Sequence, residues 1–292
     1  MHNVQSLTID EILDKASEGY FQIPQFQREF VWNNNQISTL IESALQGLPC
    51  GSIVTWEYSK NNIRKGAYRN VRLEETNSGI KSYINFPPDR TKHPAPYLVI
   101  DGLQRITAIS VAFGGLRNTT GKHRLGGRFF IDLDAPEIVG SISYKNKKQI
   151  REGKFDKEDT WVNTGLFPLN NLECPLKKSL SGSALKYWIS IVMPLCSDSD
   201  KRLAKLQVIQ AAITSPIMAE MPMEKRHPLA DIAASFELLN TQGTPVSMVD
   251  ILHSNLFEWF ESTQQKNFDL RDWIDSICQD TNKSHGWGRE KN

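Results

Sequence analysis

An apolar run is broken by Asp-Gly at residues 101–102, and the spacing of the apolar residues changes at that point. Residues 97–100 read YLVI, which is typical of a buried strand, whereas residues 103–113 carry apolar side chains at helical spacing. The sequence therefore predicts a strand, a tight turn and a helix in direct succession. A chain with this junction has to fold around a core that contains both sheet and helix.

The first 136 residues repeat this mixture of strand and helix patterns. We expect a short amphipathic helix capped by Ser6 or Thr8, and a second helix that the asparagines at 33–35 cap and Gly47 ends. Strands are expected over residues 53–58 and from residue 128 towards Pro136. Residues 60–96 form a long polar insertion that can hold a hairpin.

The pattern changes after about residue 136. Residues 141–161 look basic and loop-like, and the periodicity beyond them is mostly helical. Helices are expected over residues 184–195, 198–212, 229–239, 247–260 and 270–278. The chain is therefore predicted to be α+β, with an α/β domain at 1–136 and a mainly helical region at 137–292. The last residues carry no packing signal and fit either a frayed end or a chain cut before a further domain.

Several classes of protein do not fit the composition. The 292 residues contain no apolar run of about 18, and the N-terminus has no signal-peptide pattern, so neither a membrane span nor secretion is expected. The four cysteines lack metal-ligand spacing, which favours free thiols in a reducing cytoplasm. The six histidines also lack the spacing of a zinc or HNH site, so no nuclease centre is predicted in this chain.

The net charge of +1 hides an uneven distribution. Residues 60–130 hold thirteen Lys and Arg against four Asp and Glu, a net of +9, so the rest of the chain carries −8. A basic centre between acidic flanks indicates an anionic partner, either nucleic acid or nucleotide phosphates. A solvated loop face explains the same numbers equally well.

The strand–turn–helix junction has residues suited to an anion. The first amides of a helix have no intrahelical partner, and a glycine such as Gly102 lets a phosphate approach the backbone. Arg105 can fork onto phosphate oxygens, Gln104 can orient a water or a base, and Asp101 can bind Mg²⁺ or cap the helix. The alternative is structural, with Asp101 as a cap and Arg105 in a surface ion pair.

Two further segments stand out. IPQFQREFVW, at residues 23–32, sets Arg28 among aromatic residues, where an arginine can be stacked and ordered or can lie on the wet side of a strand. FELLNTQGTPVS, at residues 236–247, reads as a helix, a turn at Asn240 and Gly243, and a second helix. Alone, this second segment is a connector without chemistry.

Together these motifs resemble one family. Their order is IPxFQRxFxW, then GLPCGSI at residues 47–53, then strand–DGxQR–helix, then FxxLNxxGxPxS. This order is similar to that of the N-terminal domain of GmrSD-type modification-dependent restriction systems, whose fold resembles the ParB/sulfiredoxin nucleotide-binding fold. The resemblance spans roughly residues 7–260. The usual motif is DGQQR, and here Leu103 replaces the first glutamine.

The resemblance implies NTP binding with Mg²⁺ and hydrolysis, coupled to a DNA nuclease in a phage-defence or restriction system. The matching positions are Asp101, Gly102, Gln104 and Arg105, together with Arg28. Asp101, Gln104 and Arg105 are then the expected catalytic residues, with Asp101 at the metal. The nuclease is expected outside this chain, as a further domain or a partner. The sulfiredoxin branch has a catalytic cysteine in the equivalent loop, which this sequence lacks next to Asp101, so peroxiredoxin repair is not expected.

Two other functions stay open from the residues alone. One is a DNA-binding module without NTP turnover, in which the basic span contacts phosphates and Tyr68, Tyr83 and Phe86 stack on bases or simply pack. The other is a scaffold that docks a partner through the helical back half. Phosphate release, salt-sensitive DNA binding and truncation near Glu137 distinguish the three.

Overall fold

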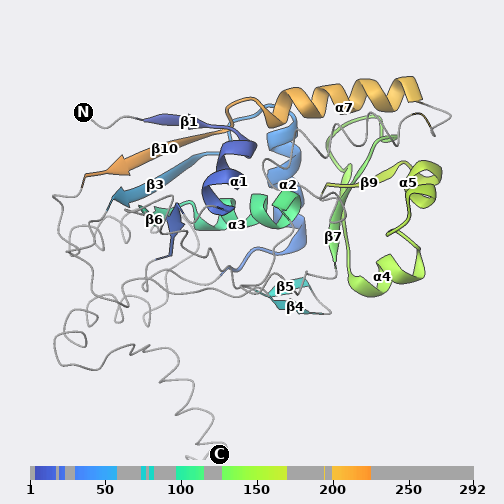
Figure 1. Ribbon diagram of the computed structural model, residues 1–292, viewed down its shortest axis with the longest axis horizontal. Coiled ribbons are helices and arrows are strands. Elements are labelled where there is room, and N and C mark those ends of the chain that lie inside the picture. Colours follow the sequence, from blue (N-terminus) through green and yellow to red (C-terminus); the bar gives the residue numbers. More distant parts are fainter. Residues whose placement is uncertain are drawn as a thin grey trace, which may run out of the picture.

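The computed structural model describes the chain in sections. They are residues 4–17, 20–23, 30–57, 74–76, 79–81, 97–114, 127–169, 194 and 199–224 (Figure 1). These sections hold two main sheets and the helices that pack on them. The protein is therefore α+β, as predicted.

The first sheet has five strands, and Figure 1 shows β1, β10 and β3 side by side next to α1. Its order is β1 (Gln5–Leu7), β10 (Met218–Met223), β3 (Ser52–Glu57), β6 (Tyr97–Asp101) and β2 (Phe21–Gln22). β10 runs parallel to β3 and antiparallel to β1, while β6 runs antiparallel to β3. A strand from residues 218–223 thus completes a sheet that is otherwise built from the first 101 residues.

Helices cover this sheet and meet one another. They are α1 (Ile9–Ser17), α2 (Asn34–Leu45) and α3 (Leu103–Ile109), the last of which continues as a short π-helix, η1 (Ser110–Gly114). α3 contacts both α1 and α2. The predicted caps are confirmed: Asn33 forms a capping box with Gln36, and Thr8 exchanges hydrogen bonds with Glu11 in the same way.

A buried charge ties α1 to the sheet. Glu220 of β10 is 1% exposed, and its carboxylate accepts hydrogen bonds from Lys15 of α1 and from the Thr55 hydroxyl of β3. Tyr20 lies beside this pair, and burial together with the negative Glu220 raises the pKa of its hydroxyl. Because each charged group here has a partner, burial of the carboxylate does not leave it unsatisfied.

The second sheet has three strands in the order β8 (Ile142–Lys145), β7 (Arg128–Asp132) and β9 (Leu166–Pro168). Two short helices follow β8, namely α4 (Lys147–Glu152) and α5 (Glu158–Thr164). The expectation that residues 141–161 are loop-like was wrong. Asn146 and Gln149 form a capping box at the start of α4, the same pattern that begins α2.

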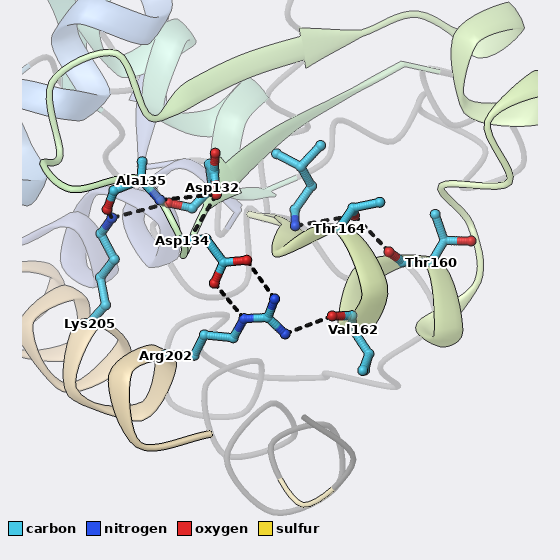
Figure 2. A network of polar contacts seen from close by, with 9 residues as sticks. Asp132, Asp134, Ala135, Thr160, Val162, Thr164, Arg202 and Lys205 are labelled. Atoms are coloured by element: carbon cyan, nitrogen blue, oxygen red, sulfur yellow. Dashed lines mark hydrogen bonds and ion pairs between the residues drawn. The ribbon is translucent and has the colours of Figure 1, made fainter. Parts of the chain in front are cut away.

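The helix α7 (Ser199–Ile213), predicted over 198–212, packs against α2 and bonds through Arg202 and Lys205 to residues around the second sheet (Figure 2). Arg202 is 4% exposed and forms a two-pronged contact with Asp134, with Nε–Oδ1 at 2.7 Å and Nη2–Oδ2 at 2.6 Å. Its Nη1 also donates to the carbonyl of Val162 at 2.7 Å. Lys205 donates to three carbonyls of the turn after β7, those of Asp132, Ala135 and Glu137. These bonds fix α7 against the second sheet.

The predicted domain boundary at residue 136 does not fall between the two sheets. β7 lies before it and pairs with β8 and β9 beyond it, and β10 returns to the first sheet. The described part of residues 137–224 is accordingly mixed rather than mainly helical. The helices expected over 184–195, 229–239, 247–260 and 270–278 lie outside the described residues, apart from residue 194.

Two remaining observations concern the insertion and the membrane. The hairpin expected within residues 60–96 is present as β4 (Glu74–Thr76) paired with β5 (Gly79–Lys81). Within the described ranges, no helix combines the length and apolar character that crossing a bilayer requires.

Candidate functional site

The strand–turn–helix junction is confirmed, and nearly all of it is buried. β6 ends at Asp101, Gly102 adopts a left-handed conformation with φ of 97°, and α3 begins at Leu103. From residue 98 to residue 113, all side chains are buried except those of Asp101 and Arg105, which are each 30% exposed. The two groups that reach the surface here are therefore a carboxylate and a guanidinium.

Arg105 is held in place by one edge of its guanidinium. Nη1 donates to the carbonyl of Ser52 at 2.8 Å and to Oδ2 of Asp101 at 3.3 Å. The rest of the group lies over Gly51, where an added Cβ would be 3.2 Å from Nε and 3.3 Å from Cζ. Among the described residues no acceptor contacts Nε or Nη2. One edge of Arg105 is thus anchored, and the described residues leave the other edge without an acceptor.

Gly102 makes room for protein rather than for a ligand. A Cβ at this position would lie 3.1 Å from Cα and Cγ1 of Ile53 and 3.1 Å from the carbonyl of Ser52. The expected clearance for a phosphate is therefore filled by strand β3 on the side where a side chain would stand. The positive φ and this close approach explain the glycine without a ligand.

Gln104 has a structural role, because its buried side chain bonds to the backbone of another segment. Its side chain is 8% exposed, and Oε1 accepts a hydrogen bond from the Val31 amide at 2.9 Å. The bond fixes the end of the 23–32 segment against α3. A role for Gln104 in orienting water or substrate stays a prediction.

Three of the four sequence motifs converge at this corner. Gln104 and Arg105 of DGLQR contact Val31 from the first motif and Ser52 from GLPCGSI. Arg28 of the first motif lies outside the described residues, as does the fourth motif around Asn240. Most of the basic span at 60–130, with Tyr68, Tyr83 and Phe86, lies outside them too.

Cys50 is a neighbour that sequence reasoning missed. The sequence separates it from Asp101 by about fifty residues, but its place directly before Gly51 brings it near Arg105 in the fold. The thiol is 8% exposed, and Sγ donates to the Leu48 carbonyl at 3.3 Å. Burial raises its pKa, and the positive Arg105 offsets part of that rise. The reactive thiolate is therefore disfavoured.

The donors at the corner suit a phosphate with its magnesium ion better than a metal held by protein alone. Asp101 offers one partly exposed carboxylate. The described residues contain no group of three or more His, Cys, Asp or Glu that could hold a metal. Mg²⁺ in proteins is often bound through one or two carboxylates plus substrate phosphates, so a single carboxylate beside a free guanidinium edge is compatible with that arrangement.

Comparison with known proteins now decides the family. The family model for the GmrSD restriction endonuclease N-terminal domain matches residues 9–257 of this chain. The chain belongs to this family. Membership agrees with the order of its motifs, and the family takes its name from a restriction endonuclease. The matched range includes every strand of both sheets except β1, and it spans residue 136.

One curated relative is similar over part of the chain. The uncharacterized protein MJ0686 of Methanocaldococcus jannaschii is 32% identical over 137 residues, which is 46% of this chain and 21% of that protein. The match therefore spans about a fifth of the relative, whose printed name assigns no activity.

Proposed function

We propose that the Asp101–Arg105 corner binds the phosphates of an NTP with Mg²⁺ and supports hydrolysis. The module acts in a phage-defence or modification-dependent DNA restriction system and controls a nuclease outside this chain. One observation supports the proposal most strongly. The carboxylate of Asp101 and the guanidinium of Arg105 are both partly exposed, whereas the rest of the strand–turn–helix is buried.

The geometry suits Arg105 to this task. Its Nη1 is held by the Ser52 carbonyl, so the planar group has one orientation, and Nε and Nη2 can donate side by side to two phosphate oxygens. The ion pair with Asp101 is long, at 3.3 Å, and both partners are 30% exposed. Such a pair is worth about 0–1 kcal/mol, so a phosphate can replace it at little cost.

Asp101 would hold the metal, with its carboxylate bound to the magnesium directly or through a water. The ion, when bound, would neutralise the charge that develops on the phosphates during transfer. The protein's own contribution is positioning and charge: Arg105 holds the phosphates, and the second arginine implied by the motif, Arg28, joins it. Gln104 holds the backbone of Val31, which follows Arg28 by three positions in the sequence, against α3.

Binding of a fluorescent NTP analogue with Mg²⁺ tests the site. Arg105→Ala should weaken binding about 10–100-fold, because charge-assisted hydrogen bonds contribute about 1.5–3 kcal/mol. Arg105→Lys should recover only part of this, since an ammonium cannot reproduce the fork. Lys201→Ala, which removes an exposed cation from α7, is the matched control and should leave binding unchanged. Equal affinity of the Arg105→Ala and Lys201→Ala proteins would refute the site.

Hydrolysis is tested separately from binding. Phosphate release is measured for the purified chain, alone and with DNA, and Asp101→Asn should abolish the magnesium-dependent part while the protein stays folded. NTP binding without any release, in either condition, would favour the alternative of a DNA-binding module without turnover.

A further inference from the structure

Residues 145–157 form a basic corner of the second sheet. The thirteen residues hold six cations and two acids, a net of +4; the cations are Lys145, Lys147, Lys148, Arg151, Lys154 and Lys157. Lys148, Arg151 and Lys154 are exposed, and Lys145 is partly exposed. This basic corner lies on β8, α4 and the turn after α4, and the Asp101–Arg105 site belongs to the other sheet.

The two acids neutralise little of this charge. Glu152 pairs with Lys148 at 3.9 Å and Asp156 with Lys157 at 3.8 Å, and all four side chains are highly exposed. Exposed pairs at such distances are loosely held and screened by salt. The next acids, Glu158 and Asp159, stand in the first turn of α5 and mark the end of the basic corner.

The backbone that carries these cations is held by ring packing and hydrogen bonds. Phe155 packs edge-on against Phe130 of β7, and its amide donates to the Ile150 carbonyl at 2.9 Å. Lys145 lies over the Phe155 ring, with Nζ 4.3 Å from its centre. Gly153 permits this packing, since a Cβ there would overlap the ring. These contacts hold the backbone of the turn that carries the cations in one conformation.

Two features indicate that these positions contribute positive charge and do not contribute local stability. Lys154 has a left-handed backbone with φ of 54°, the one such non-glycine among the described residues, where Gly or Asn would be less strained. Arg128 of β7 stands directly opposite Lys145 of β8 in the register, which adds a further cation beside the basic corner.

We propose that the basic corner contacts the phosphodiester backbone of duplex DNA. The choice of DNA as the polyanion rests on the proposed function in a DNA restriction system; the corner itself does not. Backbone contact is sequence-independent and suits Lys and Arg side chains on a rigid surface. The corner would hold the duplex while the other sheet handles the nucleotide.

Fluorescence anisotropy of a labelled duplex of about 20 base pairs, titrated with the full chain between about 50 and 200 mM KCl, tests the proposal. The triple variant Lys148→Gln, Arg151→Gln, Lys154→Gln should lower the slope of log affinity against log salt by about 0.9 for each phosphate that is no longer neutralised, and should weaken binding roughly tenfold or more at low salt. Lys154→Gln alone is compared with Lys201→Gln, an exposed lysine on α7. The Lys154 change should lower the slope and the Lys201 change should not.

Four outcomes would overturn the proposal that the basic corner contacts duplex DNA. A slope unchanged in the triple variant, equal effects of Lys154→Gln and Lys201→Gln, or no duplex binding by the unaltered chain would do so. Binding of anionic vesicles through the same residues, without duplex binding, would also reject it. NTP affinity is measured on the triple variant in parallel. Loss of duplex binding with normal NTP affinity supports the corner, whereas a chain that binds duplex but never an NTP defeats the proposed function alone.

Discussion

Replacing Gly102 with alanine separates two reasons for a glycine at the junction. If the residue is needed for packing, Gly102→Ala destabilises the fold itself, because its Cβ would meet Ile53 and the Ser52 carbonyl at 3.1 Å. If it only clears space for a phosphate, the variant stays stable and loses ligand. The structure supports the first reason.

The size of the effect follows from two terms. The left-handed conformation, with φ of 97°, costs an alanine about 1–2 kcal/mol. Crowding against backbone atoms of β3, which cannot swing aside as a flexible side chain can, adds about 1–3 kcal/mol. We therefore expect the free energy of unfolding to fall by about 2–5 kcal/mol, a large part of the roughly 5–15 kcal/mol typical of a domain.

Gly47→Ala is the matched control, and urea unfolding followed by tryptophan fluorescence is the assay. Gly47 also has a positive φ, 72°, but no atom lies within 4 Å of an added Cβ, so only the conformational term of about 1–2 kcal/mol applies. The difference between the two variants measures the crowding. Equal losses for Gly102→Ala and Gly47→Ala would refute the packing argument.

Three further predictions use the same measurement. Gln104→Ala leaves the Val31 amide without its acceptor and should lower the free energy of unfolding by about 1–3 kcal/mol. Arg202→Met, which removes the link between α7 and the second sheet, should cost about 1–3 kcal/mol, since Asp134 is half exposed and is not stranded in the core. The hydrogen bond from Arg202 holds the pKa of Asp134 below its ordinary value, so this stabilisation is present above the ordinary aspartate pKa of about 4 and is lost as pH falls through the lower folded pKa. Asp134→Asn should therefore flatten the acid side of the stability–pH curve, and an unchanged acid side would contradict the assignment.

Local signals in the sequence were enough to predict the elements around the site. The change of periodicity at Asp101 predicts β6 and α3, and the side chains of Thr8 and Asn33 predict the starts of α1 and α2. Each of these depends on residues within one or two turns of each other. The same kind of signal, Asn146 followed by Gln149, stands before α4. The high charge of that segment favoured its interpretation as a loop, so the signal was overlooked.

The strand β10 could not be found in this way. Its sequence, MAEMPM, contains a proline and a glutamate and has little strand propensity of its own. It is a strand because β1 and β3 pair with it on both sides, and because Lys15 and Thr55 satisfy Glu220. These partners are far away in the sequence, so no local pattern encodes the result. The close approach of β3 to Gly102 could not be predicted for the same reason, since Ser52 and Ile53 are far away in the sequence.

The segment that closes the first sheet also shapes the candidate nucleotide site. The Cys50 amide donates to the Ile217 carbonyl at 2.7 Å, and the Ala219 amide donates to the Gly51 carbonyl at 3.2 Å. These bonds hold the loop over which Arg105 lies and whose Ser52 carbonyl orients the guanidinium. The same segment begins as α7, whose Arg202 and Lys205 bind the second sheet. One stretch, residues 199–219, is therefore bonded at one end to the sheet with the basic corner and at the other to the support of Arg105. An NTP site built only from the first 136 residues would lack this support.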